Sequence, residues 1–313
     1  MAKKIIAVAG ATGSQGGGLV RAICSDAAGE FQARALTRDP NSEKARALAA
    51  LGAEVVACNV DEESSVRAAC EGAYGVYGVT FFWDHFSPER EQAQAAAIAS
   101  AARAAGARHV IWSTLEDSRQ FIPLDDPRMP TLMGRYKVPH FDAKAEADAS
   151  FADLPTTYLL TSFYWDNLIM FGMAPRRGEN GKLVFTLPMG DAKLPQIAAE
   201  DIGRCAYGIF QRGAELIGKR VGIAGEHLTG AEMSAKLGAA LGEEVIYFSP
   251  SFDAYRGFGF PGAEDIGNMF QFNHDFAERF CAARSVEFSK SVDPRLQTFD
   301  EWLNANKSRI TIG

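Results

Sequence analysis

A short apolar run that ends abruptly in glycine is the feature that most constrains this chain. Residues 5–9 read IIAVA and residues 10–16 read GATGSQG, with glycines at Gly10, Gly13 and Gly16. A strand that passes through such a loop into a helix presents free backbone N–H groups to phosphate. We expect Gly10 to allow a tight turn, Gly13 to admit a pyrophosphate, and Gly16 to let the helix pack closely on the strand. A glycine-rich turn that binds nothing is the alternative interpretation.

The bulk properties of the chain indicate a globular protein that contacts neither nucleic acid nor membrane. Its 313 residues, 47% of them hydrophobic, suffice for one large domain or two smaller ones. A net charge of -7 disfavours binding to a phosphate backbone. The five scattered cysteines form no metal-binding motif and indicate reduced thiols. With no signal-peptide core and no run near the ~20 apolar residues of a membrane span, we expect a cytoplasmic protein without a metal site.

Apolar runs typical of strands alternate with alanine-rich runs typical of helices through the first half of the chain. This rhythm predicts an α/β fold, a Rossmann-type doubly wound parallel sheet with helices on both faces. We expect strands at 5–9, 32–36, 54–57, 75–80, 109–113, 157–161 and 220–224. We expect helices at 17–25, 42–51, 63–71, 88–105, 139–152 and 200–212.

The remaining segments predict a smaller α+β cap rather than a second independent domain. Residues 163–195 are rich in glycine, proline and aromatics, and we expect loops and short strands there. Helices are expected at 229–241, 263–284 and 299–307. We therefore assign 1–160, with about 196–225, to an NAD(P)-binding Rossmann domain, and 161–195 with 226–313 to the cap.

The end of the second expected strand bears on cofactor preference. Sites that prefer NAD place Asp or Glu there, to bond the ribose 2′-hydroxyl. This chain has Thr37 and Arg38 instead. A guanidinium matches the geometry of a 2′-phosphate, so the sequence predicts NADP(H) rather than NAD(H). A solvent-exposed arginine at a strand end is the alternative.

The same motifs resemble those of the NmrA-like family of atypical short-chain dehydrogenase/reductases. The resemblance covers nearly the whole chain, and its later motifs are more specific than the glycines. The similar stretches are GATGSQGG, LTRDP, VTFFW (79–83), HFDAK (140–144), SFYWDNL (162–168), LPMGD (187–191) and GFPGAEDIGNMF (259–270).

The resemblance implies that NADP(H) binds in a cleft between the Rossmann domain and the cap. Gly10 and Gly13 would shape the loop, with Thr12, Ser14, Gln15 and Gly16 at the pyrophosphate and Arg38 at the 2′-phosphate. Asp61 would lie near the adenine, Thr80 and Phe81 along the cofactor channel, and Phe163, Tyr164 and Asn167 over the nicotinamide. The alternative for the aromatics at 81–83 is an ordinary place in the core.

Active short-chain reductases carry a Tyr-x-x-x-Lys pair, and the matching residues here are His140 and Lys144. Their i, i+4 spacing places both on one helical face, so Lys144 is expected to reach the nicotinamide ribose. His140 replaces the proton-donating tyrosine, and it is either a donor itself or a structural histidine. Ser113 matches the serine position of the reductases, or merely caps a strand end. Tyr164 is a further candidate proton donor.

Two functions remain open from the sequence. The absent tyrosine, and the resemblance to NADPH-sensing relatives, favour an NADP(H)-binding redox sensor or regulator that acts through a protein partner. The alternative is an NADPH-dependent reductase of a carbonyl, quinone or imine, with a small aromatic or apolar substrate. The alanine-rich helices at 88–105 and 139–152 are candidate faces for a homodimer.

Overall fold

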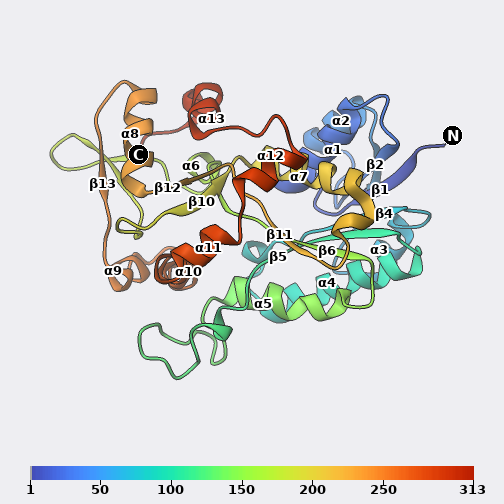
Figure 1. Ribbon diagram of the computed structural model, residues 1–313, viewed down its shortest axis with the longest axis horizontal. Coiled ribbons are helices and arrows are strands. Elements are labelled where there is room, and N and C mark those ends of the chain that lie inside the picture. The colour runs from blue at the N-terminus through green and yellow to red at the C-terminus, as the bar shows by residue number, and fades with distance from the viewer. Residues whose placement is uncertain (1) are drawn as a thin grey trace.

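A seven-stranded sheet forms the centre of the computed structural model, which describes residues 2–313 (Figure 1). All of its strand pairs are parallel, in the order β11-β6-β5-β4-β1-β2-β3. The strands are β1 (Lys4–Val8), β2 (Phe31–Thr37), β3 (Glu54–Ala57), β4 (Gly75–Gly78), β5 (His109–Thr114), β6 (Thr156–Leu160) and β11 (Arg220–Gly222). The predicted Rossmann-type sheet is confirmed. Its strand order reverses between β1 and β4, where such sheets bind ligands.

Helices cover both faces of this sheet, as predicted. Figure 1 shows α1 (Ser14–Ser25), α2 (Glu43–Ala50) and α7 (Ala199–Arg212) on one side. On the other side lie α3 (Glu63–Ala69), α4 (Pro88–Ala104) and α5 (Pro139–Ala147). Local sequence sets where the helices begin: the hydroxyls of Ser42 and Ser87 accept the N–H of the third helical residue, and Pro88 occupies the first turn of α4.

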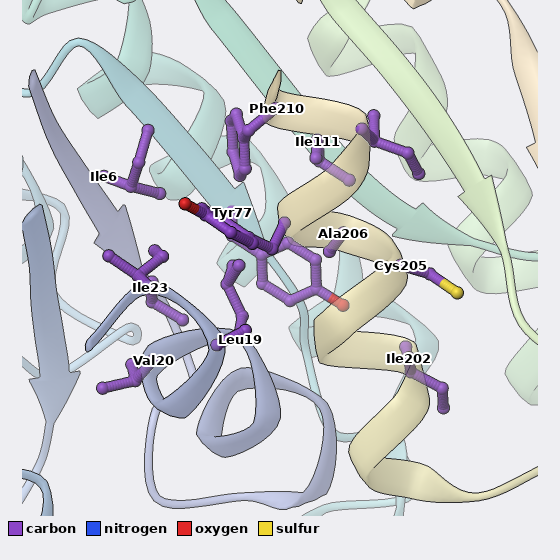
Figure 2. Packing of buried hydrophobic residues seen from close by; sticks show 14 of the residues in the cluster. Ile6, Leu19, Val20, Ile23, Tyr77, Ile111, Ile202, Cys205, Ala206 and Phe210 are labelled. Atoms are coloured by element: carbon purple, nitrogen blue, oxygen red, sulfur yellow. The ribbon is translucent and has the colours of Figure 1, made fainter. Parts of the chain in front are cut away.

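The first apolar core lies between the sheet and the helices α1 and α7. Figure 2 shows Leu19 and Ile23 of α1 facing Ile202 and Phe210 of α7, with Tyr77 of β4 between them. On the opposite face, Trp112 of β5 stacks on Phe151 with ring centroids 4.6 Å apart. Because both faces are buried, the central strands are apolar throughout rather than alternating.

Two three-stranded sheets with helices form the cap beside the parallel sheet (Figure 1). One contains β7 (Phe163–Tyr164), β10 (Leu194–Ile197) and β12 (Glu226–Leu228), and the other β8 (Arg176–Arg177), β9 (Leu183–Thr186) and β13 (Val245–Phe248). The helices are α6 (Asn167–Met170), α8 (Gly230–Leu241), α9 (Phe252–Arg256), α10 (Ala263–Asp275), α11 (Ala277–Ala282) and α13 (Phe299–Asn306). A third core cluster fills this region, while α12 (Val286–Val292) packs on α7.

A buried ion pair joins the cap to the carboxyl edge of the parallel sheet. Arg284, which has no exposed surface, donates two hydrogen bonds to Glu116 after β5 and one to the carbonyl of Thr161 after β6. Its guanidinium also lies 3.6 Å from the ring centroid of Phe280. Removing either partner would leave a buried charge uncompensated, so this contact fixes where the cap sits.

Several boundaries differ from the sequence-based expectation. The helix expected at 263–284 is two helices, interrupted at Phe276, and the one expected at 139–152 becomes a 3-10 turn at Asp148–Phe151. Helix α1 begins at Ser14, three residues before the expected start, because its glycines allow the first turn to wind directly off the loop. The strands β12 and β13 were not predicted at all. The domain boundaries at 160 and 225 stay a prediction.

Candidate functional site

Two glycines fix the loop between β1 and α1. Gly10 has a φ of +62°, which only glycine adopts without strain. A Cβ at Gly16 would lie 2.5 Å from the carbonyl oxygen of Gly10, so no other residue fits without a backbone shift. The N–H of Gly13 donates to the same carbonyl at 2.9 Å. The loop is therefore held in one tight shape by its own backbone.

This loop leaves hydrogen-bond donors free at the start of α1. Among residues 2–313, the N–H groups of Thr12, Ser14 and Gln15 have no acceptor. The helix has no side-chain cap at Gly13 and no acidic residue in its first turn. Unpaired donors and the positive end of a helix dipole suit a bound phosphate. The backbone here thus fits the pyrophosphate that the sequence predicts.

Arg38 stands directly after β2, on the same carboxyl edge of the sheet. Its side chain is 71% exposed and donates one hydrogen bond to Asp84, at 3.2 Å. An exposed pair of this kind contributes little stability. The guanidinium is therefore free to turn to a phosphate ester at low cost.

Asp61 lies at the same edge, but its carboxylate is already engaged. Arg90 donates to both oxygens, at 2.8 and 2.6 Å, and Gln94 donates to one of them at 2.8 Å. The Arg90 guanidinium is the main reason that the pKa of Asp61 falls to about 2. Its expected contact with adenine stays a prediction.

Lys144 of α5 is held by three hydrogen bonds in a buried site. Its Nζ donates to Glu91 Oε1 at 2.5 Å, to Thr80 Oγ1 at 2.8 Å and to the carbonyl of Thr80 at 3.1 Å. Glu91, from α4, is fully buried, and sequence reasoning did not single it out. These contacts use all the donors of the ammonium. A bond to the ribose would require Lys144 to exchange one of these partners.

One side of this cluster is unsatisfied. Oε2 of Glu91 and Nε2 of His85 are both buried without a hydrogen-bond partner among residues 2–313, and they lie 3.4 Å apart. Nδ1 of His85 accepts the N–H of Ser87, so the proton of the neutral ring is on Nε2, facing Glu91. Glu91 thus lies between a lysine and a histidine.

His140 forms a buried pair with an acid from the cap. Its Nδ1 lies 2.6 Å from Asp265 Oδ1, and its backbone N–H donates to Asp265 Oδ2 at 3.2 Å. Asp265 belongs to the first turn of α10, 125 residues away, and the sequence gave no local signal for it. Nε2 of His140 has no partner in the described chain, yet it is not among the atoms sealed from solvent. One nitrogen is therefore fixed by a carboxylate and the other is available.

Aromatic rings surround His140. The ring of Trp83 lies 4.7 Å from the imidazole, centroid to centroid, and Phe141 lies at 4.8 Å. Phe82 is 2% exposed, whereas Phe81 is 47% exposed. Phe82 therefore belongs to the core, whereas Phe81 lies at the surface. The expected place of Phe81 along the cofactor channel stays a prediction.

Gln15 joins two tyrosines across the start of α1. The hydroxyl of Tyr77 donates to its carbonyl oxygen, and its amide nitrogen donates to the hydroxyl of Tyr164. Gln15 would therefore meet a phosphate through its N–H and not its side chain. Burial raises the pKa of the Tyr164 hydroxyl, which makes Tyr164 a poorer proton donor than an exposed tyrosine. Ser113 is buried next to the Tyr77 hydroxyl.

The remaining predicted residues lie on the cap side. Phe163 of β7 is half-buried and packs on Phe270, with centroids 6.0 Å apart. Asn167 begins the short helix α6. Their expected place over the nicotinamide stays a prediction.

A separate cavity of about 540 Å³ opens beside Ser14, between α1, α7 and the cap helix α13. It is strongly polar, but most of its charges pair within the protein: Arg21 with Glu200, and Arg204 with Asp201 and Asp293. We interpret it as a polar gap between the parallel-sheet lobe and the cap. Among residues 2–313 there is no cluster of potential metal ligands, and no helix combines the length and apolar character needed to cross a membrane.

The strand order and the glycine loop after β1 define a Rossmann-type protein, a class that binds ligands at the carboxyl ends of its strands. Within that class, the chain belongs to the NmrA-like family, whose model matches residues 2–303. The resemblance seen in the sequence is confirmed.

Curated relatives and a solved structure match over most of their length. The NmrA-like family domain-containing oxidoreductase FrzB of Cladobotryum sp is 27% identical, over 94% of this chain and 91% of its own. An NAD(P)H azoreductase of Xenophilus azovorans is 30% identical over 82% of both chains. The crystal structure of NmrA, a negative transcriptional regulator, superimposes with a TM-score of 0.78 at 21% identity, over 96% of this chain and 95% of NmrA. At that identity, the structural match supports the fold alone.

The pair of Asp61 and Arg90 gives a pH-dependent prediction. Since the pKa of Asp61 falls from 3.8 to about 2, the pair stabilises the fold above pH 4, and this is lost as the pH falls towards 2. Because the Asp61 side chain is 31% exposed, we expect Asp61→Asn to cost only about 1 kcal/mol at pH 7. Urea unfolding at pH 7 and pH 3 should show the difference shrinking at the lower pH. Asp153→Asn, at the more exposed pair with Arg103, should cost less.

Proposed function

We propose that the protein is an oxidoreductase that binds NADP(H) and reduces a carbonyl, quinone, imine or related double bond. The free N–H groups at the start of α1 would hold the pyrophosphate, and Arg38 the 2′-phosphate. When bound, the cofactor supplies a hydride. The protein must then provide a proton and hold the acceptor in the reactive orientation.

The single observation that carries this proposal is the pair of His140 and Asp265. Asp265 holds Nδ1, so in the imidazolium form the only unengaged proton is on Nε2. This nitrogen is not sealed from solvent, although the residue is only 6% exposed and its ring packs against Trp83 and Phe141. A fixed ring with one free donor is the arrangement that general acid catalysis needs. His140 would thus take the place of the missing tyrosine, with Asp265 as its positioning residue.

Lys144 has a different role in this proposal. Its ammonium, held by Glu91 and Thr80, lies one helical turn from His140 on the same side of α5. It would orient the ribose by exchanging one of the Thr80 contacts while keeping Glu91. Retaining Glu91 avoids leaving a buried carboxylate without a counter-charge.

The named relatives support an oxidoreductase. The azoreductase of Xenophilus azovorans is named for its use of NAD(P)H, and FrzB is named as an oxidoreductase. Both match over most of this chain. The match to FrzB covers 94% of the chain and so includes the region of His140 and Asp265.

A redox sensor that binds NADP(H) without turnover is the second candidate. The observation that favours it is the tight engagement of Lys144, whose donors are all used by Glu91 and Thr80. If Lys144 does not reach the ribose, NADP(H) would be held by the glycine loop and by Arg38. Such a protein signals only if NADPH and NADP+ stabilise its states to different extents.

The cofactor assignment predicts that Arg38→Gln weakens NADPH binding by about tenfold to a hundredfold, because a charge-assisted contact to the phosphate is lost. Binding of NADH should be unchanged. Titration calorimetry measures both. Arg108→Gln removes an exposed arginine without side-chain partners in the described chain and should change neither affinity. Equal loss for NADPH and NADH would contradict the assignment.

The proton-donor assignment predicts that His140→Gln lowers kcat by about a hundredfold, since the proton source is removed. The affinity for NADPH should stay close to that of the unchanged protein. The assay is loss of NADPH absorbance with a panel of quinones, carbonyls and azo compounds. His274→Gln is the matched control, because His274 also pairs with an acid, Asp275, but is 38% exposed. Full activity in His140→Gln would show that another group donates the proton.

The same panel separates the two candidate functions. A reductase consumes NADPH with at least one acceptor. A sensor consumes none, and it binds NADPH and NADP+ with different affinities or forms different oligomers with each. A protein with no turnover, equal affinities and one assembly state would be neither.

A further inference from the structure

Exposed aromatic side chains gather in two segments of this chain. Phe81 and Phe86, between β4 and α4, are 47% and 39% exposed, and Phe258 and Phe260, between α9 and α10, are 50% and 36% exposed. Large apolar side chains that stay in solvent close to one another usually mark a binding site. Core packing does not account for them, because the neighbouring Phe82 fills that role.

These two segments touch, although they lie far apart in the sequence. A Cβ built at Gly262 would lie 2.8 Å from the ring of Trp83 and 3.2 Å from that of Phe86. Phe260 precedes Gly262 by two residues and packs on Tyr255, with ring centroids 5.9 Å apart. Trp83 and Phe86 pack edge to face at 5.7 Å. Trp83 and Phe86 thus meet the segment that carries Phe260, at the point where the cap contacts the parallel-sheet lobe.

His140 lies at the same point. Trp83 contacts the imidazole, and the segment that carries Phe260 leads directly into α10, whose first turn provides Asp265. Helices α10 and α5 are neighbours, as Figure 1 shows. Of the subsite rings, Trp83 therefore packs directly on the imidazole that we assign as proton donor, and Phe86 packs on Trp83.

The recess of His140 decides between a small molecule and a protein as the occupant. His140 is only 6% exposed, whereas Phe86 and Phe260 are 39% and 36% exposed, so the imidazole is more deeply buried than these two rings. A flat ring can enter between aromatic side chains and reach Nε2 of the imidazole, whereas the surface of a folded protein would rest on the phenylalanines. The one free donor also suits a ligand with a single acceptor atom near an otherwise apolar body.

We propose that Trp83, Phe86 and Phe260 form the acceptor subsite, and that it takes a planar, uncharged aromatic compound such as a bicyclic quinone. The ring of the ligand packs against these side chains, and its oxygen accepts a hydrogen bond from the Nε2–H of the His140 imidazolium. This inference rests on the proposed function, because it names the substrate class of the same site.

The test measures binding rather than turnover. Menadione, a bicyclic quinone, is titrated into the protein saturated with NADP+, which cannot reduce it, and tryptophan fluorescence is followed. Trp112, Trp165 and Trp302 are buried, whereas Trp83 is partly exposed, so quenching reports chiefly on Trp83. We expect Phe260→Ala and Phe86→Ala each to weaken menadione binding by about tenfold. Phe260→Leu, which keeps the bulk but not the ring, should fall between.

The controls separate this subsite from a general loss of structure. Phe248→Ala removes a more exposed phenylalanine, 50% exposed on β13, and should leave menadione binding unchanged. The affinity for NADP+ should be the same in every variant. Menadione binding that matches the unchanged protein in both Phe260→Ala and Phe86→Ala overturns the proposal. So does a change of oligomeric state in these variants, measured by sedimentation, because the patch would then be a protein interface.

Failure of the subsite and failure of the proposed function give different results. Tight menadione binding that depends on Phe260, with no NADPH consumed by any acceptor, leaves the subsite standing and removes the reductase. Turnover of menadione with an unchanged KM in both variants keeps the reductase and removes the subsite.

Discussion

The contact between Gly16 and the carbonyl of Gly10 is the constraint on which the site depends. A Cβ at position 16 would lie 2.5 Å from that oxygen. Helix α1 can therefore start at Ser14 only because residue 16 is glycine. The early start points the first turn of α1 at the carboxyl edge of the sheet and leaves its N–H groups without acceptors. Its further course places Leu19 and Ile23 against α7, which builds the larger lobe around the same helix.

Local sequence was sufficient for the parallel sheet. Each central strand is an apolar run bounded by polar or glycine-rich turns, and some of the crossing helices have a capping residue or a proline at their start, as at Ser42 and Pro88. The cap was harder, because its strands are short and pair with distant segments. Val245–Phe248 became a strand by pairing with Leu183–Thr186, a partner that no local pattern reveals. The break at Phe276 has the same origin, since tertiary packing ends α10 where the helical pattern continues.

The candidate site divides along the same line. The glycine loop and Arg38 follow from residues that are close in sequence, and the structure places them at one edge of the sheet. The partners that give His140 and Lys144 their chemistry are distant: Asp265 lies 125 residues from His140, and Glu91 lies 53 residues from Lys144. Both acids lie in the first turn of a helix, where acidic residues are common at the surface, so the sequence does not show that they are buried. Only the fold shows that α4, which carries Glu91, and α10, which carries Asp265, both pack against α5.

The two acids come from different parts of the molecule, and this difference separates two roles on one helix. Glu91 belongs to α4, which packs along α5 within the parallel-sheet lobe, so Lys144 has a partner that does not depend on the cap. Asp265 belongs to α10 in the cap, so His140 is fixed only while the cap is docked there. A displacement of the cap would separate Asp265 from the imidazole and Gly262 from Trp83, yet leave the contact of Lys144 with Glu91 in place. The roles proposed for Lys144 and His140 therefore rest on separate contacts, one within the parallel-sheet lobe and one between that lobe and the cap.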